Sequence, residues 1–257
     1  MKADNFTLKK YFERINYNSE INSHISTVSE IMRCQLFSVP FENLDVQAGK
    51  IVSLVPEEIV EKILVRNRGG SCYEVNGLFA MALEELGVPY IFVAARPMIY
   101  PVRRPKTHMA IVAEVEGEKW LIDLGFGSNS IRMPMRLDVV DVEVVQDGYL
   151  FMLSKTDESR YRLKAFVEDE WVEQYEFDLY PQEWIDFFPA NHLNSTHPDT
   201  IFVKKLIVVL HNPTGKVILM GDTLKTVSNG ITTKQFVSPK NRAAILAKNF
   251  GLVAPEG

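Results

Sequence analysis

Cys72 lies in a stretch of sequence whose residue types favour a reactive thiolate. The stretch reads Arg68-Gly69-Gly70-Ser71-Cys72-Tyr73-Glu74-Val75-Asn76. Ser71 and Glu74 have the S-x-x-E spacing of a capping box, so Cys72 is predicted at the first position of a helix. Unpaired backbone N–H groups and the helix dipole favour a thiolate at that position. Gly69 and Gly70 leave space before the sulfur, which favours a nucleophile over the alternative, a small buried side chain.

A cysteine nucleophile needs a base, and the base needs a third group to orient it. Among the five histidines, His108 begins a predicted strand, and the return strand carries Asp123 among apolar neighbours. If residues 116–117 form a two-residue turn, residue 115 pairs with residue 118, and His108 and Asp123 become diagonal neighbours on one face. An unpaired buried carboxylate is costly, so the pattern predicts that these two side chains interact. The other histidines are interpreted as structural or solvated: His24, His192, His197 and His211.

Two further features flank the predicted pair. Arg103, Arg104 and Lys106 form a compact cluster of positive charge without an acid nearby in the sequence, which predicts a seat for an anionic cofactor tail. A solvated loop is the alternative interpretation. Gly125-Phe126-Gly127 follows Asp123 directly. Its flexible backbone and single aromatic ring would allow a flat substrate to approach closely, and the alternative interpretation is an ordinary turn.

Helical spacing of apolar residues organises the first third of the chain. It predicts helices over Asn5–Ile15 and Ser19–Met32, one that begins at Pro56, and the Cys72 helix, which closes at Gly87. Phe37–Asp45 contains an internal proline and is predicted to be an ordered loop. Cys34 is predicted to belong to the core.

Short β-rich runs follow and indicate a barrel or a curled antiparallel sheet. The predicted strands are Tyr90–Arg96, His108–Val115, Lys119–Leu124, Gly148–Ser154, Arg160–Val167 and Trp171–Phe177. A connector rich in proline and asparagine, with a short helix, leads to three further strands, Phe202–Leu210, Lys216–Met220 and Leu224–Val227, and to a last helix after Ser238-Pro239. The fold class is therefore α+β. We expect residues 1–87 to carry the nucleophile, 88–197 the histidine and the acid, and 198–257 a small C-terminal unit.

Composition narrows the classes of function. The 257 residues carry 28 Lys and Arg against 33 Asp and Glu, a net charge of −5, which disfavours nucleic acid as a partner. Two cysteines and no metal-ligand spacing predict neither a disulfide framework nor a metal site, so a cytoplasmic location is expected. No signal-like or membrane-spanning apolar run is found in the sequence, so no membrane association is expected.

The motifs together resemble those of the arylamine N-acetyltransferase family. Its R-G-G-x-C-x-E-x-N pattern matches the Cys72 stretch, its P-F-E-N-L segment matches Pro40–Leu44, and the segment from Trp184 to Pro198 resembles its connector. The resemblance implies a helical bundle, an antiparallel β-barrel and an α/β lid around a cysteine-protease-like Cys-His-Asp core. It also implies acetyl transfer from acetyl-coenzyme A to the nitrogen of arylamines or arylhydrazines, or the oxygen of N-hydroxyarylamines, without a metal.

The resemblance also assigns roles to individual residues. Cys72 would be the acetylated nucleophile, with His108 and Asp123 completing a triad. The remaining candidates are Phe41, Phe126 and Gly127 for the acceptor, Arg103, Arg104 and Lys106 for coenzyme A, the backbone N–H of Tyr73 for the oxyanion, and Glu42, Arg68 and Asn76 as supports. Two alternatives stay open: a papain-like thiol hydrolase or transglutaminase-like acyltransferase with the same triad, and a binding protein in which the triad is idle.

Overall fold

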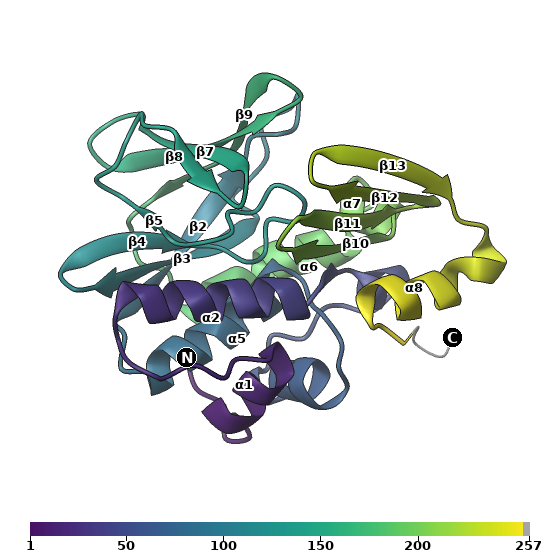
Figure 1. Ribbon diagram of the computed structural model, residues 1–257, viewed down its shortest axis with the longest axis horizontal. Helices are drawn as coiled ribbons and strands as arrows, with labels where there is room; N and C mark the ends of the chain where they lie inside the picture. Colours follow the sequence, from purple (N-terminus) through teal and green to yellow (C-terminus); the bar gives the residue numbers. More distant parts are fainter. Residues whose placement is uncertain (254–257) are drawn as a thin grey trace.

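The computed structural model describes residues 1–253, so the last four residues of the expected C-terminal unit lie outside the described part. Helices occupy α1 (Leu8–Ile15), α2 (Ile25–Ser38), α3 (Leu44–Gln47), α4 (Pro56–Val60), the π-helical turn η1 (Glu61–Val65), α5 (Cys72–Glu85), the 3₁₀ turn η2 (Trp184–Phe187), α6 (Phe188–Thr196), α7 (Ile201–Lys204), the 3₁₀ turn η3 (Pro239–Asn241) and α8 (Arg242–Phe250). Two antiparallel sheets complete the fold (Figure 1). No helix within residues 1–253 is long and apolar enough to cross a bilayer.

Helix α5 is the central helix of the N-terminal layer, and its residues from Cys72 to Leu83 are buried. The Glu74 carboxylate accepts a hydrogen bond from the Ser71 N–H at 2.8 Å, and Gly87 follows the helix with φ +68°, as the sequence predicts. The Gln35 amide of α2 donates to the Val75 carbonyl of α5 at 2.8 Å. This contact ties α2 to α5, beneath the large sheet (Figure 1).

The large sheet has eight strands in the order β5-β4-β3-β2-β9-β8-β7-β6. Their bounds are β2 (Tyr90–Pro97), β3 (His108–Val115), β4 (Glu118–Ile122), β5 (Met135–Arg136), β6 (Val144–Gln146), β7 (Tyr149–Lys155), β8 (Arg160–Val167) and β9 (Glu170–Asp178). The backbone ladder leaves β5 and β6 as its edges. The side chain of Gln146 in β6 accepts from the N–H groups of Arg132 and Met133, just before β5, so the expected barrel is a curled sheet whose edges are joined by a side chain.

The β3–β4 hairpin has the register predicted from the sequence. Val115 pairs with Glu118 and Ile111 with Ile122. Glu116 and Gly117 both have positive φ, 55° and 80°, as a two-residue hairpin turn requires. The hairpin therefore places residues 108 and 123 on the same face.

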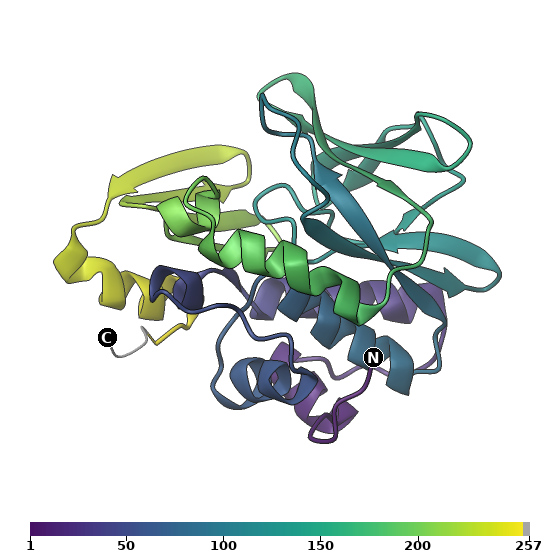
Figure 2. The ribbon, with the colours of Figure 1, turned by 180° about the vertical axis from the view of Figure 1, so that it is seen from behind.

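The smaller sheet joins one short strand from the first fifth of the chain to four strands from its last fifth. Its order is β1-β10-β11-β12-β13, with β1 (Phe41–Glu42), β10 (Ile207–Asn212), β11 (Gly215–Met220), β12 (Thr223–Ser228) and β13 (Ile231–Phe236). It packs on α8 through a cluster that includes Val208, Leu219 and Leu246. Figure 2 shows α6, in green, running across the back of the molecule from the smaller sheet toward the N-terminal helices.

Some predicted boundaries are wrong for local reasons. Helix α2 begins at Ile25 and runs through Ser38, rather than over Ser19–Met32, because the Asn22 side chain accepts from the His24 N–H at 3.0 Å and the Thr27 hydroxyl at 2.6 Å in a preceding turn. Cys34 on this helix is half-buried at the edge of the core.

Two predicted segments change type because of one long-range contact. The expected loop Phe37–Asp45 contains β1 and the start of α3, and the expected strand Phe202–Leu210 begins as α7 before β10. The Asn43 amide donates to the carbonyls of Phe202 and Lys205 and accepts from the Ile207 N–H at 2.7 Å. Asn43 thus holds the turn between α7 and β10, and β5, β6 and β13 are further strands that the sequence did not predict.

Candidate active site

Cys72 is the first residue of α5 and is 5% exposed. Strand β1 lies beside it, because the Gly70 N–H donates to the Pro40 carbonyl and the Glu42 N–H donates to the Gly70 carbonyl. Gly125 packs on its other side. A Cβ at Gly125 would lie 2.5 Å from the Cys72 Cα, so only glycine fits at this position.

His108 and Asp123 make the contact that the hairpin predicts. His108 Nε2–H donates to Asp123 Oδ2 at 2.7 Å, and the two side chains are 5% and 0% exposed. The Cys72 side chain lies close enough to His108 to raise the pKa of the ring, and both residues line one cavity. The structure therefore orders a thiol, an imidazole and a carboxylate in one buried chain.

The charge state of His108 follows from these neighbours. Burial by itself lowers the pKa of His108, but the negative charge of Asp123, the hydrogen bond to it and the contacts with Cys72 outweigh burial and raise the pKa to about 10. At neutral pH the ring is held as an imidazolium. An imidazolium beside Cys72 can donate a proton to a leaving group.

Asn76, one turn into α5, fixes the carboxylate. Its amide group donates to Asp123 Oδ1 at 3.1 Å and to the Met109 carbonyl at 2.7 Å, and its oxygen accepts from the Leu124 N–H at 2.8 Å. The Gly125 N–H also donates to Asp123 Oδ1, at 2.8 Å. The predicted support Asn76 thus connects the nucleophile helix to both strands of the hairpin.

Two cavities border Cys72, and the larger of them, of about 160 Å³, also borders His108. Phe41 and Phe126, both predicted to contact substrate, line it, and Gly127 lines it with φ +95°. The half-buried Phe126 ring stands edge-on to His108 with centroids 5.0 Å apart. The cavity combines a reactive group with aromatic and aliphatic walls, as in sites for small apolar ligands.

Tyr175 and Asn194 are site residues that sequence reasoning missed. The Tyr175 ring lies 5.1 Å from His108 and 4.9 Å from Phe126, centroid to centroid. The Asn194 amide donates to the Thr107 carbonyl at 3.0 Å, next to His108 in the chain. Neither residue stands in a motif with the triad, and alternation within β9 was the only sequence signal for Tyr175.

The side chain of Tyr73 points away from the larger cavity. Its hydroxyl donates to the Thr107 carbonyl at 2.7 Å, and the residue is 1% exposed. Its backbone N–H, at the second position of α5, lies next to Cys72 in the free first turn of the helix.

A buried charge network lies under the Cys72 loop. The predicted supports Glu42 and Arg68 form an ion pair at 2.7 Å. Lys62, which the sequence did not single out, contacts Glu74 at 2.7 Å and Asp45 at 2.6 Å. A single lysine on a predicted helix is normally expected to be exposed to solvent, so only the tertiary structure identifies Lys62 as buried.

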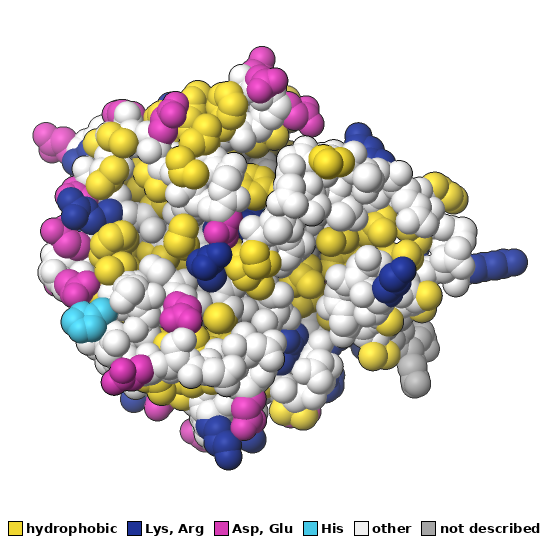
Figure 3. Space-filling model, in the orientation of Figure 1, with side chains coloured by type: hydrophobic (Ala, Val, Ile, Leu, Met, Phe, Trp, Pro, Cys, Tyr) yellow, Lys and Arg dark blue, Asp and Glu magenta, His cyan; other side chains and the backbone are white. Residues whose placement is uncertain are grey.

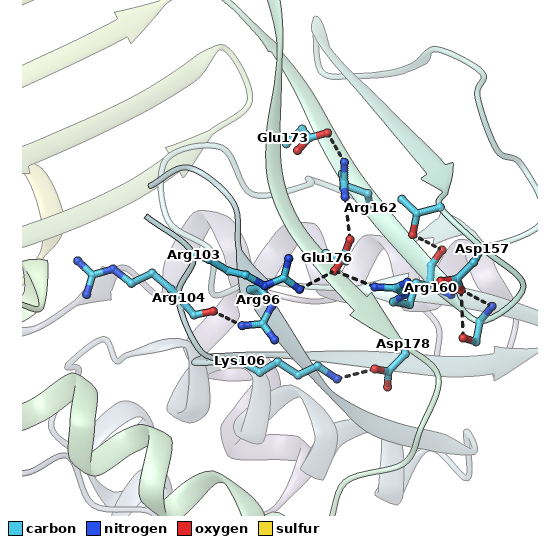
Figure 4. Close-up of polar contacts among 12 residues, drawn as sticks. Arg96, Arg103, Arg104, Lys106, Asp157, Arg160, Arg162, Glu173, Glu176 and Asp178 are labelled. Atoms are coloured by element: carbon cyan, nitrogen blue, oxygen red, sulfur yellow. Dashed lines mark hydrogen bonds and ion pairs between the residues drawn. The ribbon is translucent and has the colours of Figure 1, made fainter. Parts of the chain in front are cut away.

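The basic cluster before His108 has no acid nearby in the sequence, but the fold brings two acids to it. Figure 4 shows strand β9 opposite it: Arg103 lies 4.0 Å from Glu176, and Lys106 pairs with Asp178. These acids are some 70 residues away in the sequence. Arg104 alone of the three lines the larger cavity, with its guanidinium 5.0 Å from the Tyr100 ring centroid.

The smaller sheet holds the loop that carries Phe126. His211 Nε2–H donates to the Gly127 carbonyl at 2.9 Å, and Lys216 donates to the Ser128 carbonyl. Burial, with the charges of Lys216 and Arg132, lowers the pKa of His211 to about 3, so the ring is neutral. His211 is thus structural, as the sequence indicates. Across residues 1–253 there is no group of three or more His, Cys, Asp or Glu that could hold a metal ion.

Comparisons with known proteins extend along nearly the whole chain. Residues 24–256 match a family described as N-acetyltransferase. An arylamine N-acetyltransferase of Escherichia coli (strain K12) is 30% identical over 250 residues, covering 95% of this chain and 88% of that protein. The solved structure of the arylamine N-acetyltransferase from Salmonella typhimurium aligns with a TM-score of 0.91 at 26% identity, over 97% of this chain and 92% of that one. The Mycobacterium marinum arylamine N-acetyltransferase, solved in complex with CoA, aligns with a TM-score of 0.89 at 28% identity, over 95% and 92%.

Proposed function

This chain belongs to the arylamine N-acetyltransferase family, and from that premise we propose that it transfers an acetyl group from acetyl-coenzyme A through an acetyl-Cys72 intermediate. The acceptor is the nitrogen of an arylamine or arylhydrazine, or the oxygen of an N-hydroxyarylamine. The observation that carries the proposal is the buried chain Cys72, His108, Asp123 at the wall of an aromatic cavity.

In the first half-reaction, the Cys72 thiolate attacks the thioester carbonyl. A bond forms between Cys72 Sγ and the carbonyl carbon, the bond to the coenzyme sulfur breaks, and coenzyme A leaves as a thiol with the proton from His108. The Tyr73 N–H, in the free first turn of α5, donates to the developing oxyanion.

In the second half-reaction, the amine attacks acetyl-Cys72. His108 takes the amine proton, the bond to Cys72 Sγ breaks, and the acetylated amine leaves. Asp123 keeps the imidazole in one orientation and stabilises its charged form, and Asn76 keeps Asp123 in place.

The residues that line the larger cavity favour binding of both the arylamine and the coenzyme. Phe41 and Phe126 offer aromatic faces to a flat amine. The relative from Mycobacterium marinum was solved with CoA, and in this chain Arg104 offers a cation to an anionic coenzyme at the larger cavity. On the face drawn in Figure 3, acidic side chains gather over the large sheet and the N-terminal helices, while the side formed by the smaller sheet and α8 shows apolar and basic ones. An anion meets less repulsion on that side.

Intact-protein mass spectrometry with acetyl-coenzyme A and no amine tests the intermediate. We expect one acetyl adduct on Cys72 and none in Cys72→Ser. Cys34, half-buried and outside both cavities, is the internal control. An adduct that maps to Cys34, or no adduct at all, overturns the mechanism.

A thiol hydrolase would use the same triad but resolve the intermediate with water. We expect release of coenzyme A to be much slower without arylamine than with it, and parallel double-reciprocal lines when the arylamine is varied. If coenzyme A is released equally fast in both cases, water resolves the intermediate and the protein is a hydrolase.

A further inference from the structure

Cys72 borders two cavities, and only the larger belongs to the reaction as described so far. The smaller has about 20 Å³ and lies between α3, α5, α6 and the start of α7. Its walls include Val46, Val52 and the Tyr73 ring. The rings of Phe41 and Phe202, 5.9 Å apart, border both cavities.

His108 distinguishes the two sides of Cys72, because it lines the larger cavity and not the smaller. The leaving coenzyme and the attacking amine both exchange a proton with His108, so both must occupy its side. The carbonyl carbon of an acyl-cysteine carries three groups: the sulfur, the oxygen and the acyl chain. With the oxygen at the start of α5 and the nucleophiles beside His108, the smaller cavity is left for the acyl chain.

Most polar side chains around the smaller cavity have protein partners, but the buried Ser71 hydroxyl has none within residues 1–253. The Asn191 amide donates to the Val52 carbonyl at 2.7 Å, and the Ser195 hydroxyl accepts from the Val52 N–H at 3.3 Å. The Asn43 amide group is engaged with the turn before β10. The surface that faces the smaller cavity is chiefly aliphatic and aromatic, which suits a hydrocarbon group.

We propose that the smaller cavity is the acyl-chain subsite and that its size restricts the donor to short acyl thioesters; this rests on the acyl-Cys72 mechanism above. A volume of about 20 Å³ holds roughly one water-sized group, which is the size class of the acetyl methyl. Each additional methylene of a longer chain exceeds that volume. In a hydrophobic pocket, one misfitting methylene changes a rate by roughly 10- to 200-fold.

Val52 and Val46 are the residues that set the size of this subsite. Both are buried, at 5% and 8% exposure, and neither takes part in the hydrogen bond between His108 and Asp123. Val52→Ala removes two methyl groups from the wall. We expect Val52→Ala to raise the rate of Cys72 acylation by butyryl-coenzyme A, relative to the rate with acetyl-coenzyme A, by at least roughly tenfold. Tenfold is roughly the lower end of the effect of a single methylene in a hydrophobic pocket.

The assay is the time course of the acyl adduct on Cys72 by intact mass, with acetyl-, propionyl- and butyryl-coenzyme A and no amine. Val209→Ala is the matched control, since Val209 is equally buried but borders only the larger cavity. We expect the control to keep the wild-type ratio of butyryl to acetyl rates. A changed ratio in Val209→Ala with an unchanged one in Val52→Ala places the chain in the larger cavity and overturns the proposal.

Val46→Ala serves as the second variant if thermal unfolding shows that Val52→Ala is not folded. An unchanged ratio in a folded Val46→Ala also overturns the proposal. These failures are separable from failure of the mechanism: if the wild type forms no acetyl adduct, the proposed function fails, whereas normal acetyl adducts with unaltered chain-length ratios refute the subsite alone.

Discussion

Replacing Gly125 by alanine tests the packing that positions the nucleophile. The new Cβ would lie 2.5 Å from the Cys72 Cα and 2.8 Å from its Cβ. Ordinary contact begins at 3.4 Å, so the two segments must separate by 3.4 − 2.5, about 0.9 Å. Both are held, Cys72 by the first turn of α5 and Gly125 by its hydrogen bond to Asp123.

A displacement near 1 Å in reacting groups costs about 100-fold in rate. We therefore expect Gly125→Ala to acylate Cys72 about 100-fold more slowly than the wild type, and overpacking to lower the free energy of unfolding by about 1–3 kcal/mol. The rate is measured by quenching mixtures with acetyl-coenzyme A and following the adduct by mass. Unfolding in urea gives the stability.

Gly117→Ala separates displacement from general strain. Gly117 has φ +80° with open space around it, in the β3–β4 turn away from Cys72. It should lose stability, by about 1 kcal/mol, because alanine is strained at positive φ, and acylate at the wild-type rate. If a folded Gly125→Ala acylates Cys72 within threefold of the wild-type rate, close packing at this glycine does not position the nucleophile.

Three further results are expected. Asp123→Asn should keep the fold by circular dichroism yet slow acylation about 10⁴-fold, since an amide leaves the imidazole in the wrong tautomer; wild-type acylation would make Asp123 merely structural. The pKa of His108 is raised from 6.5 to about 10, which adds up to about 5 kcal/mol of stability to the folded state. This stability is complete below pH 6.5 and is lost as the pH rises through 10. The difference in unfolding free energy between the wild type and His108→Gln should therefore shrink from pH 7 to pH 10. The pKa of Lys216 is lowered to about 8, which changes stability with pH in the opposite direction, but this effect is the same in the wild type and in His108→Gln. A difference in unfolding free energy that stays constant with pH would contradict the ion pair between His108 and Asp123. Arg104→Ser should raise the KM for acetyl-coenzyme A and flatten its salt dependence more than Arg103→Ser does, and equal effects would count against Arg104.

The sequence by itself determined the elements whose signals are local. The spacing of Ser71 and Glu74 located the start of α5, and a two-residue turn at 116–117 set the register of the hairpin. From these two facts follow the position of Cys72 and the pairing of His108 with Asp123. Capping and hairpin register depend on residues within about 15 positions of one another, which is why pattern reasoning reached them.

Tertiary structure decided what lies between distant segments. Glu176 and Asp178 reach the basic cluster from β9, and Asn43 breaks an apolar run at Phe202 more than 150 residues away, so no local pattern records either contact. The two cavities beside Cys72 are also features that no local sequence pattern records. Their walls come from helices and strands that meet only after both sheets have packed, and their sizes are set by that packing rather than by any single motif.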